Sequence, residues 1–165
     1  MVSRSVSKLA VKYLSEREGG MRLDVHDDGF GFPTVGVGHL VLDDDNLAIG
    51  DLITELQGAT LLQDDLEWAR EAVERFVKLS LAQHEFDALV IFCFNIGYNG
   101  FKKSSLVRRL NKHENKEAVV QYEMPRWNKV QGQFVRGLRN RRIDTAQMFV
   151  ACDYKVDWSG LSGQT

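Results

Sequence analysis

The stretch Glu18–Leu40, EGGMRLDVHDDGFGFPTVGVGHL, decides how the first part of the chain folds. Apolar residues alternate with other residues on both sides of a glycine-rich turn, with Leu23 and Val25 before it and Val35 and Val37 after it. Successive side chains of a strand point to opposite faces, so this period of two predicts a hairpin of two antiparallel strands. No other segment has a comparable pattern, and we expect strands only here.

Helical patterns flank this hairpin. Residues 4–18 repeat apolar side chains at intervals of three and four, and Gly19-Gly20 favours a helix end directly after them. The expected apolar stripe of this helix is Val6, Leu9, Ala10, Tyr13 and Leu14. Thr54 and Gln57 have the spacing of a capping box, which predicts the start of a long amphipathic helix. Its expected apolar stripe is Ala59, Leu62, Leu66, Ala69, Val73 and Phe76. Further helices are predicted at 83–96, 104–111, 116–123 and 139–150.

These elements predict an α+β fold, mostly α, with a small β-hairpin lobe, a larger helical lobe and a cleft between them. The segment 83–96 is the richest in apolar residues, so we expect it at the centre of the helical lobe. We expect a single domain over residues 1–165, with a small lobe at 18–53 and a helical lobe at 1–17 and 54–150. The remaining tail, 151–165, has weak periodicity and is expected to be loosely held.

The composition is that of a globular protein. The 165 residues are 44% hydrophobic with a formal net charge of −2, which gives no overall positive field to attract nucleic acid. A local basic segment at 126–142 is either a solvated surface or a binding face. The two cysteines are far apart in sequence, and Cys93 lies in an apolar run typical of a buried thiol. The sequence has no signal-peptide pattern and no apolar run of membrane-spanning length.

Glu18 and Asp28 are the candidate catalytic carboxylates. Glu18 continues the apolar face of the first helix, where partial burial and the helix dipole both favour the protonated form that a general acid needs. If Leu23 and Val25 pack inward, strand alternation places Asp28 on the opposite, open face. Two carboxylates across a cleft suit glycoside hydrolysis, with one protonating the leaving oxygen and the other handling water, which Thr34 could hold. The alternatives are a helix-end glutamate paired with an arginine and an ordinary Asp-Asp-Gly turn.

Other chemistries find no support in the sequence. His39 has no second histidine or cysteine at ligand spacing, so we expect no metal and assign His39 a structural role beside an acid. The sequence has no GxSxG motif around a serine, and residues 36–38 lack the remaining glycine of a dinucleotide-binding loop.

The same residues resemble the signature of the phage-type lysozyme (endolysin) family. The resemblance starts with Glu18-Gly19, continues through the strand at 22–28 and Gly31, and includes Thr34-Val-Gly-Val-Gly-His39. Five later segments match the landmarks of the family's helical lobe, in the same order: residues 86–90, 94–97, 104–106, 126–128 and 137–142. The resemblance covers roughly residues 5–150 and implies a lysozyme-like fold.

The resemblance implies a muramidase that cleaves the β-1,4 bond between N-acetylmuramic acid and N-acetylglucosamine in bacterial peptidoglycan, without a cofactor. Glu18 matches the proton donor, Asp28 the aspartate that positions or activates water, and Thr34 the threonine beside that water. Inversion at the anomeric carbon is expected. An arginine of the cluster 139–142, most closely Arg139, matches the residue that pairs with the catalytic glutamate.

The resemblance also implies binding and structural roles. Asn95 and Gly97 match positions of the cleft wall where substrate lies. His39 matches a salt-bridged histidine whose partner would be Asp65, with the pair lying between the lobes. For the aromatic residues Phe86, Phe92 and Trp127, core packing is favoured over sugar stacking.

The spacing departs from the family pattern at one place. The family usually has eight residues between the glutamate and the aspartate, whereas here eight residues lead to Asp27 and nine to Asp28. Counting back from Thr34 gives Asp28, and so does strand parity, so we expect Gly19-Gly20 to absorb the extra residue. His26 stands where the family often has tyrosine and is expected to border the cleft.

The expected biological role is that of an endolysin, a monomer that waits in the host cytoplasm until it reaches the cell wall. Its expected partner is peptidoglycan, with no nucleic acid and no embedding in a membrane. Three alternatives remain at this point: a virion-associated lysozyme, a delivered antibacterial toxin with the same chemistry, and a non-catalytic wall-binding module. Chitinase activity is a further alternative within the same chemistry.

Overall fold

The computed structural model describes residues 3–155 and divides the chain into two compact units. The sheet unit comprises residues 11–67, and the helical unit comprises residues 1–10 and 68–165, of which 3–10 and 68–155 are described. Among the described residues, no helix is both long and apolar enough to cross a membrane.

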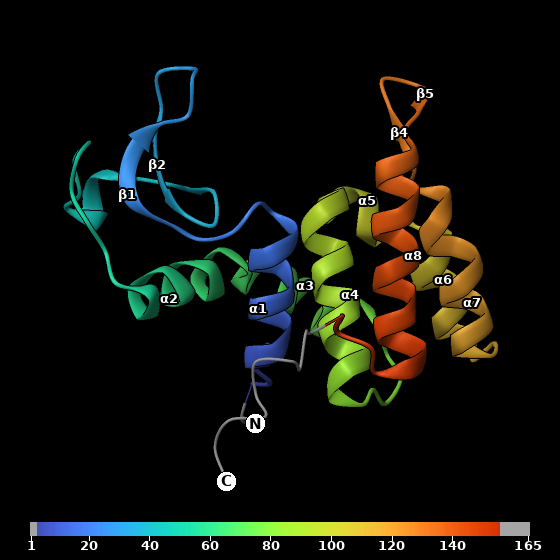
Figure 1. Ribbon diagram of the computed structural model, residues 1–165. Helices are drawn as coiled ribbons and strands as arrows, with labels where there is room; N and C mark the ends of the chain where they lie inside the picture. Colours follow the sequence, from blue (N-terminus) through green and yellow to red (C-terminus); the bar gives the residue numbers. More distant parts are fainter. Residues whose placement is uncertain (1–2, 156–165) are drawn as a thin grey trace, which may run out of the picture. The chain divides into compact units, whose positions relative to one another are not determined.

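A three-stranded antiparallel sheet forms the centre of the sheet unit (Figure 1). Its strands, in the order β1-β2-β3, are β1 (Arg22–Asp27), β2 (Pro33–Gly36) and β3 (His39–Leu40). The segment after the short helix η1 (Asp43–Asp45) returns along β1, since Val25 N–H donates to Asp51 O and Ile53 N–H to Leu23 O, both at 2.9 Å or less. This returning segment was not anticipated from the sequence.

The core of the sheet unit explains the alternation in β1. Val25, Val35 and Ile53 are buried together, with Leu23 and Leu61 packed against them. The predicted inward face of β1 is therefore confirmed. The helix α2 (Glu55–Asp65) packs against all three strands, and Leu61 is its contribution to this cluster.

Helix α1 (Lys8–Arg17) is shorter than the helix predicted at 4–18. It begins where the Ser7 hydroxyl accepts the Ala10 N–H at 3.2 Å, as an N-cap does. Ala10 and Leu14 are buried as expected, but Leu9 is 37% exposed, so the predicted stripe is wrong at that residue.

The long helix predicted from residue 54 is two helices. The capping box is present, with Gln57 N–H donating to Thr54 Oγ1 at 3.1 Å and Thr54 N–H to Gln57 Oε1 at 2.8 Å. The helix α2 ends at Asp65, and α3 (Glu67–Phe76) follows directly. Leu66 keeps helix-like dihedral angles and still donates its N–H to Leu62 O, so the apolar spacing continues through the break and conceals it.

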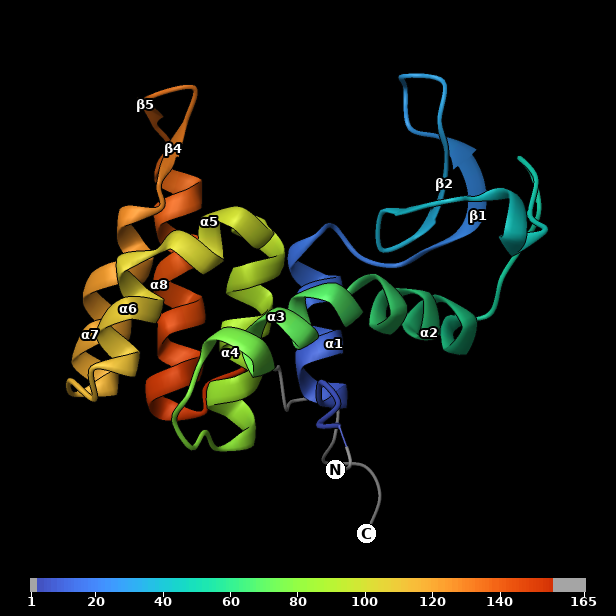
Figure 2. The same cartoon turned by 180° about the vertical axis from the view of Figure 1, so that it is seen from behind.

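The helical unit surrounds α4 (Gln83–Ile96), which is buried from Glu85 to Cys93. Its central place was predicted and is confirmed. Figures 1 and 2 show α8 beside α4, with α6 and α7 on the other side of α8. The remaining elements are α5 (Tyr98–Lys103), α6 (Ser105–Asn111), α7 (Lys116–Glu123), η2 (Met124–Arg126), β4 (Lys129–Val130), β5 (Gln133–Phe134) and α8 (Arg136–Ala151).

Three features of the helical unit differ from expectation. Helix α5 follows Gly97 directly, and β4 and β5 form a second hairpin, although strands were expected only near the N-terminus. The tail prediction is wrong at Tyr154, which is 7% exposed and donates its hydroxyl to Asp87 Oδ2 at 2.7 Å. The rest of that prediction, residues 156–165, lies outside the described residues.

Thr54→Ala should lower the free energy of unfolding by about 1 kcal/mol, because it removes the acceptor for an N–H at the start of α2. Urea unfolding at neutral pH measures the change. Thr60→Ala, an exposed position of the same helix whose hydroxyl donates only to Leu56 O, is the matched control and should cost less. Equal losses in the two variants would contradict a capping role for Thr54.

Candidate functional site

Asp27 is the last residue of β1 and Asp28 the first residue after it, and both hold the loop that follows. Asp28 N–H donates to Phe32 O at 3.0 Å, which closes a loop of residues 28–32. The Asp28 carboxylate accepts the N–H groups of Phe30 at 2.8 Å and Phe32 at 3.2 Å, both through Oδ1. Asp28 is thus the first residue of the loop, and the backbone amides of Phe30 and Phe32 hold its carboxylate.

Strand pairing places Asp28 and Thr34 on the same side of the sheet. His26 lies opposite Thr34, while Val25 and Val35 point into the core. Because side chains alternate along a strand, His26, Asp28 and Thr34 belong to the face turned away from that core. The Thr34 hydroxyl lies 3.4 Å from Phe32 O, to which it donates.

Glu18 is the first residue after α1. Its N–H donates to Leu14 O at 2.9 Å, and Gly20 N–H donates to Ser15 O at 2.9 Å. Both Gly19 (φ +95°) and Gly20 (φ +91°) occupy the left-handed region, which glycine adopts without strain. The Glu18 side chain is exposed, so the expected partial burial is wrong, because the helix ends one residue before it.

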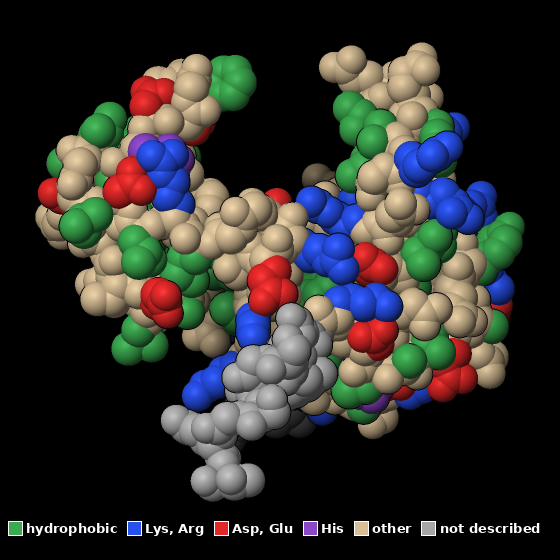
Figure 3. Space-filling view, in the orientation of Figure 1, with side chains coloured by type: hydrophobic (Ala, Val, Ile, Leu, Met, Phe, Trp, Pro, Cys, Tyr) green, Lys and Arg blue, Asp and Glu red, His purple; other side chains and the backbone are tan. Residues whose placement is uncertain are grey.

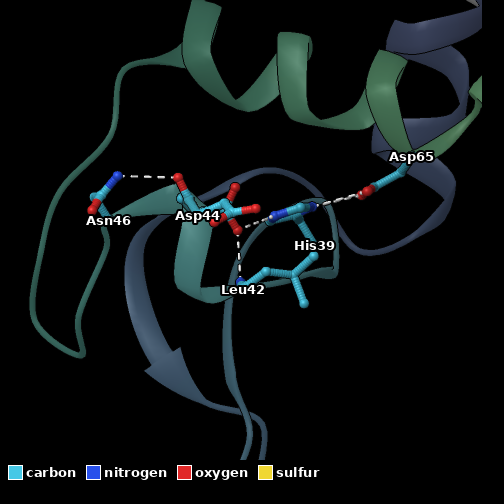
Figure 4. Close-up of polar contacts among 6 residues, drawn as sticks. His39, Leu42, Asp44, Asn46 and Asp65 are labelled. Carbon is cyan, nitrogen blue, oxygen red and sulfur yellow. Dashed lines mark hydrogen bonds and ion pairs between the residues drawn. The ribbon is translucent and has the colours of Figure 1, made fainter.

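His39 lies between two carboxylates (Figure 4). Its Nδ1 is 2.9 Å from Asp65 Oδ1, and its Nε2 is 3.0 Å from Asp45 Oδ2. The contact between His39 and Asp65 expected from the family resemblance is present. Its expected place between the lobes is wrong, because both residues lie in the sheet unit. Asp45 was missed, although its place in a run of three aspartates so close to His39 was a usable signal.

The two carboxylates determine the charge state of His39. Burial alone lowers the pKa of the imidazole, but the hydrogen bonds and charges of Asp45 and Asp65 outweigh it, and the pKa of His39 is raised. The pKa of Asp45 is lowered, mainly because its carboxylate accepts the Leu42 N–H and also because it bonds His39. The imidazolium form with two donating N–H groups fits this geometry.

Asn95 and Gly97 lie at the end of α4 in the helical unit. Asn95 Oδ1 accepts a hydrogen bond from Arg142 Nη1 at 3.0 Å, and Arg142 Nε donates to Trp127 O at 3.3 Å. Gly97 has φ +87° and links α4 to α5, a conformation that requires glycine. This bond orients the Asn95 amide, whose Nδ2 group can donate to a ligand.

Arg142 was not singled out from the arginine cluster. It is 5% exposed, whereas Arg139, the predicted site residue, is exposed on the same helix. Position on α8 could not have distinguished them from the sequence, because Arg139 lies two turns before the buried Ala146 and so shares that side of the helix with Arg142. Figure 3 shows Lys and Arg side chains gathered on the drawn face of the helical unit. Of the basic segment, Arg126, Lys129, Arg136 and Arg139 are exposed.

The predicted site residues divide between the two units. Glu18, Asp28 and Thr34 belong to the sheet unit, together with His39 and Asp65, whereas Asn95, Gly97 and Arg139 belong to the helical unit. The sheet unit therefore carries both predicted catalytic carboxylates and the hydroxyl predicted to hold the water. Among residues 3–155, no group of three or more His, Cys, Asp and Glu side chains has the arrangement of a metal site.

Comparisons with known proteins identify relatives of this chain. Residues 16–145 match the family model for phage lysozyme. The chain is 38% identical over 116 residues to the endolysin of Bacillus phage PZA, covering 70% of this chain and 43% of that endolysin. It is 40% identical over 97 residues to the endolysin of Salmonella phage P22, covering 58% of this chain and 66% of that endolysin. The chain thus spans less than two thirds of the length of these curated relatives.

Solved structures with the same fold include two with about 30% identity. A mutant of P22 lysozyme matches with a TM-score of 0.79 and 31% identity, covering 90% of this chain and 99% of that one. The muramidase domain of SpmX from Asticaccaulis excentricus matches with a TM-score of 0.73 and 30% identity, with the same coverage of 90% and 99%. The predicted fold class is confirmed by these neighbours and by the mostly helical structure with its small antiparallel sheet.

The stabilising effect of His39 should depend on pH. Because its pKa is raised by folding, its contribution is complete below the unfolded value of about 6.5 and is lost as pH rises through the folded pKa. The contribution of Asp45, whose pKa is lowered, is present above about pH 4 and is lost as pH falls through its folded pKa. The free-energy difference between wild type and His39→Gln should therefore be largest at about pH 5 to 6.

Urea unfolding of the wild type and His39→Gln at several pH values measures this difference. Thr60→Ala changes no titratable group, so its difference from wild type should not vary with pH in the same way. A His39 contribution that grows above pH 7 would contradict the assigned ion pairs.

Arg142→Ala should lower the free energy of unfolding by about 1–3 kcal/mol, because it leaves Asn95 Oδ1 and Trp127 O without their donor. Arg139→Ala, an exposed position three residues earlier on α8, should change it by no more than about 0.5 kcal/mol. Urea unfolding of both variants makes the comparison. A larger loss in Arg139→Ala would reverse the assignment of the structural arginine.

Proposed function

Because the chain belongs to the phage lysozyme family, we propose that it is an N-acetylmuramidase acting on bacterial peptidoglycan. The scissile bond is the β-1,4 link between N-acetylmuramic acid and N-acetylglucosamine. One observation carries the proposal: the segment that matches the family, residues 16–145, contains Glu18, Asp28 and Thr34 within a single compact unit. The muramidase domain of SpmX, similar over 90% of this chain, supports the same substrate class.

Glu18 is the proposed general acid. It donates its proton to the glycosidic oxygen as the bond from the anomeric carbon to that oxygen breaks, so the leaving sugar departs with a free hydroxyl. Glu18 follows α1 directly, and its backbone N–H donates to Leu14 O. The helix therefore fixes the position of the Glu18 backbone. The glycines that follow allow the chain to turn away from the helix at once.

Asp28 and Thr34 are proposed to handle the water. The Asp28 carboxylate accepts the water proton while the water oxygen forms the new bond to the anomeric carbon, and the Thr34 hydroxyl orients that water from the neighbouring strand. Attack from the face opposite the leaving group would invert the anomeric centre. Thr34 pairs with His26, which lies two residues before Asp28. This pairing supports the separate roles of Thr34 and Asp28.

The helical unit is proposed to bind the substrate. Asn95 would donate from Nδ2 to a sugar carbonyl or hydroxyl, in the orientation that the bond from Arg142 to Oδ1 gives its amide. Gly97 would allow the glycan to approach the backbone closely, and Arg139 would supply a positive charge to the substrate-binding surface of this unit. No cofactor takes part in these steps.

The proposed biological role is that of a phage endolysin, which acts as a monomer on the cell wall of the infected host. Its relatives among curated proteins include endolysins and SAR-endolysins of several phages. Peptidoglycan is the proposed partner, and nucleic acid is not. The protein would wait in the host cytoplasm and reach the periplasm when the inner membrane is opened.

Glu18→Gln should lower the rate of peptidoglycan hydrolysis by about 100-fold or more, since glutamine has no proton to donate to the leaving oxygen. Mass spectrometry of fragments released from purified peptidoglycan measures both rate and product, and N-acetylmuramic acid at the reducing ends identifies a muramidase. Glu16→Gln, an exposed glutamate two residues earlier on α1, is the matched control and should keep full activity. Cleavage of peptide or amide bonds by the wild type would refute the proposal, and full activity of Glu18→Gln would refute the role of Glu18.

A further inference from the structure

The carboxylates of Asp27 and Asp28 hold the loop after β1 by accepting alternate backbone N–H groups. Four consecutive backbone N–H groups, from Gly29 to Phe32, point in turn to Asp27 and Asp28. Asp27 Oδ1 accepts those of Gly29 at 2.7 Å and Gly31 at 3.2 Å. Asp28 Oδ1 accepts those of Phe30 at 2.8 Å and Phe32 at 3.2 Å.

The two residues that Asp27 holds are both glycines, which have more backbone conformational freedom than any other residue type. Gly29 and Gly31 both have φ +91°, and neither would be confined to that conformation by a side chain. Hydrogen bonds from backbone N–H groups to a charged carboxylate are among the stronger ones in proteins. Asp27 therefore restricts the glycines on both sides of Phe30, whose own N–H is the shorter of the two bonds to Asp28.

Asp28 is the residue whose orientation depends on these bonds. Its Oδ1 accepts two N–H groups from the loop, and the described residues place no hydrogen-bond donor on its Oδ2. Oδ2 is thus the oxygen left to accept a proton from water. Its direction is set by the positions of the Phe30 and Phe32 amides, and those positions depend on the glycines that Asp27 holds.

Because side chains alternate along a strand, two adjacent aspartates can accept hydrogen bonds from different amides of the same loop. Asp27 belongs to the same side of β1 as Val25, and Asp28 to the side of His26. The loop is consequently held from both sides. Each aspartate accepts only alternate N–H groups of this loop, those two and four residues after it.

We propose that Asp27 is a positioning residue for Asp28, acting through the amides of Gly29 and Gly31 rather than by contact with substrate. This inference rests on the proposed muramidase function, in which Asp28 handles the water. Asp27 needs only an acceptor oxygen for its part, whereas Asp28 needs an ionised carboxylate. Asparagine should therefore replace Asp27 but not Asp28.

Three variants test this division. Asp27→Asn keeps an acceptor for both glycine amides and should retain kcat within about threefold, while Asp27→Ala should lower kcat by about 10- to 100-fold, the range that follows from misplacing a catalytic group by about 1 Å. KM should change little in either variant, because Asp27 does not touch the substrate. Asp28→Asn should lower kcat by about 100-fold or more, although its amide oxygen can accept the same two N–H groups.

Steady-state hydrolysis of soluble peptidoglycan fragments separates kcat from KM. Asp51→Ala is the matched control, since Asp51 also holds a turn of the sheet unit through a backbone amide, that of Ala48 at 2.8 Å. It should lose stability without a comparable loss of kcat. Unchanged kcat in Asp27→Ala, a loss confined to KM, an equal loss in Asp27→Asn, or an equal loss of kcat in Asp51→Ala would each overturn the proposal.

Amide NMR of the full chain separates this inference from the proposed function. In Asp27→Ala, the resonances of Phe30 and Phe32 should shift along with those of Gly29 and Gly31, and all four amides should exchange faster with solvent. Unchanged Phe30 and Phe32 amides would overturn the coupling between the two aspartates, whatever the activity. A wild type that releases no N-acetylmuramic acid ends would instead refute the muramidase function, while the NMR result still decided whether Asp27 orders the loop around Asp28.

Discussion

The packing of Val25 and Val35 into one small core is the constraint on which the rest of the sheet unit depends. A strand has only two faces, so burying Val25 decides the sides of its neighbours His26 and Asp27. It directs His26 and Asp28 toward the face of Thr34, and it leaves Asp27 on the side of the core at the strand end. A shift of one residue would exchange the two aspartates, and with them the groups proposed for water handling and for loop support.

Carboxylates hold the loop beyond β1 and the start of β3. Asp27 and Asp28 satisfy four amides of the loop beyond β1, and Asp45 and Asp65 hold His39 at the start of β3. Buried polar groups must be paired, and the almost fully buried His39 has a carboxylate at each ring nitrogen. Charge-assisted hydrogen bonds thus contribute to the specific geometry of this sheet.

In the helical unit, the buried Arg142 has a similar role. Arg142 joins α8 to the end of α4 through Asn95 and to the chain after η2 through Trp127 O. This arrangement gives Asn95 a defined orientation before any ligand is present. The proposed substrate contact and the packing of three elements therefore share a single side chain, which couples the stability of the unit to the shape of its binding surface.

The sequence by itself determined the hairpin, its inward face, the capping box of α2, the central α4 and the contact of His39 with Asp65, the last through family resemblance. Each of these depends on short-range periodicity or on a motif whose residues lie close together or in a known order. It did not reveal the break at Leu66, because helical spacing continues across it, nor the β4–β5 hairpin, whose strands of two residues each are too short for a period to appear.

Only the tertiary structure decided how the carboxylates are used. It placed Glu18 just outside α1 and exposed, added Asp45 to His39, buried Arg142 instead of Arg139, and joined Tyr154 to Asp87 across 67 residues of sequence. It also showed that Asp27 and Asp28 hold alternate amides of one loop. The physical reason is that a hydrogen bond forms only where a donor and an acceptor lie close together in space. No local pattern of residue types determines which distant residues become neighbours.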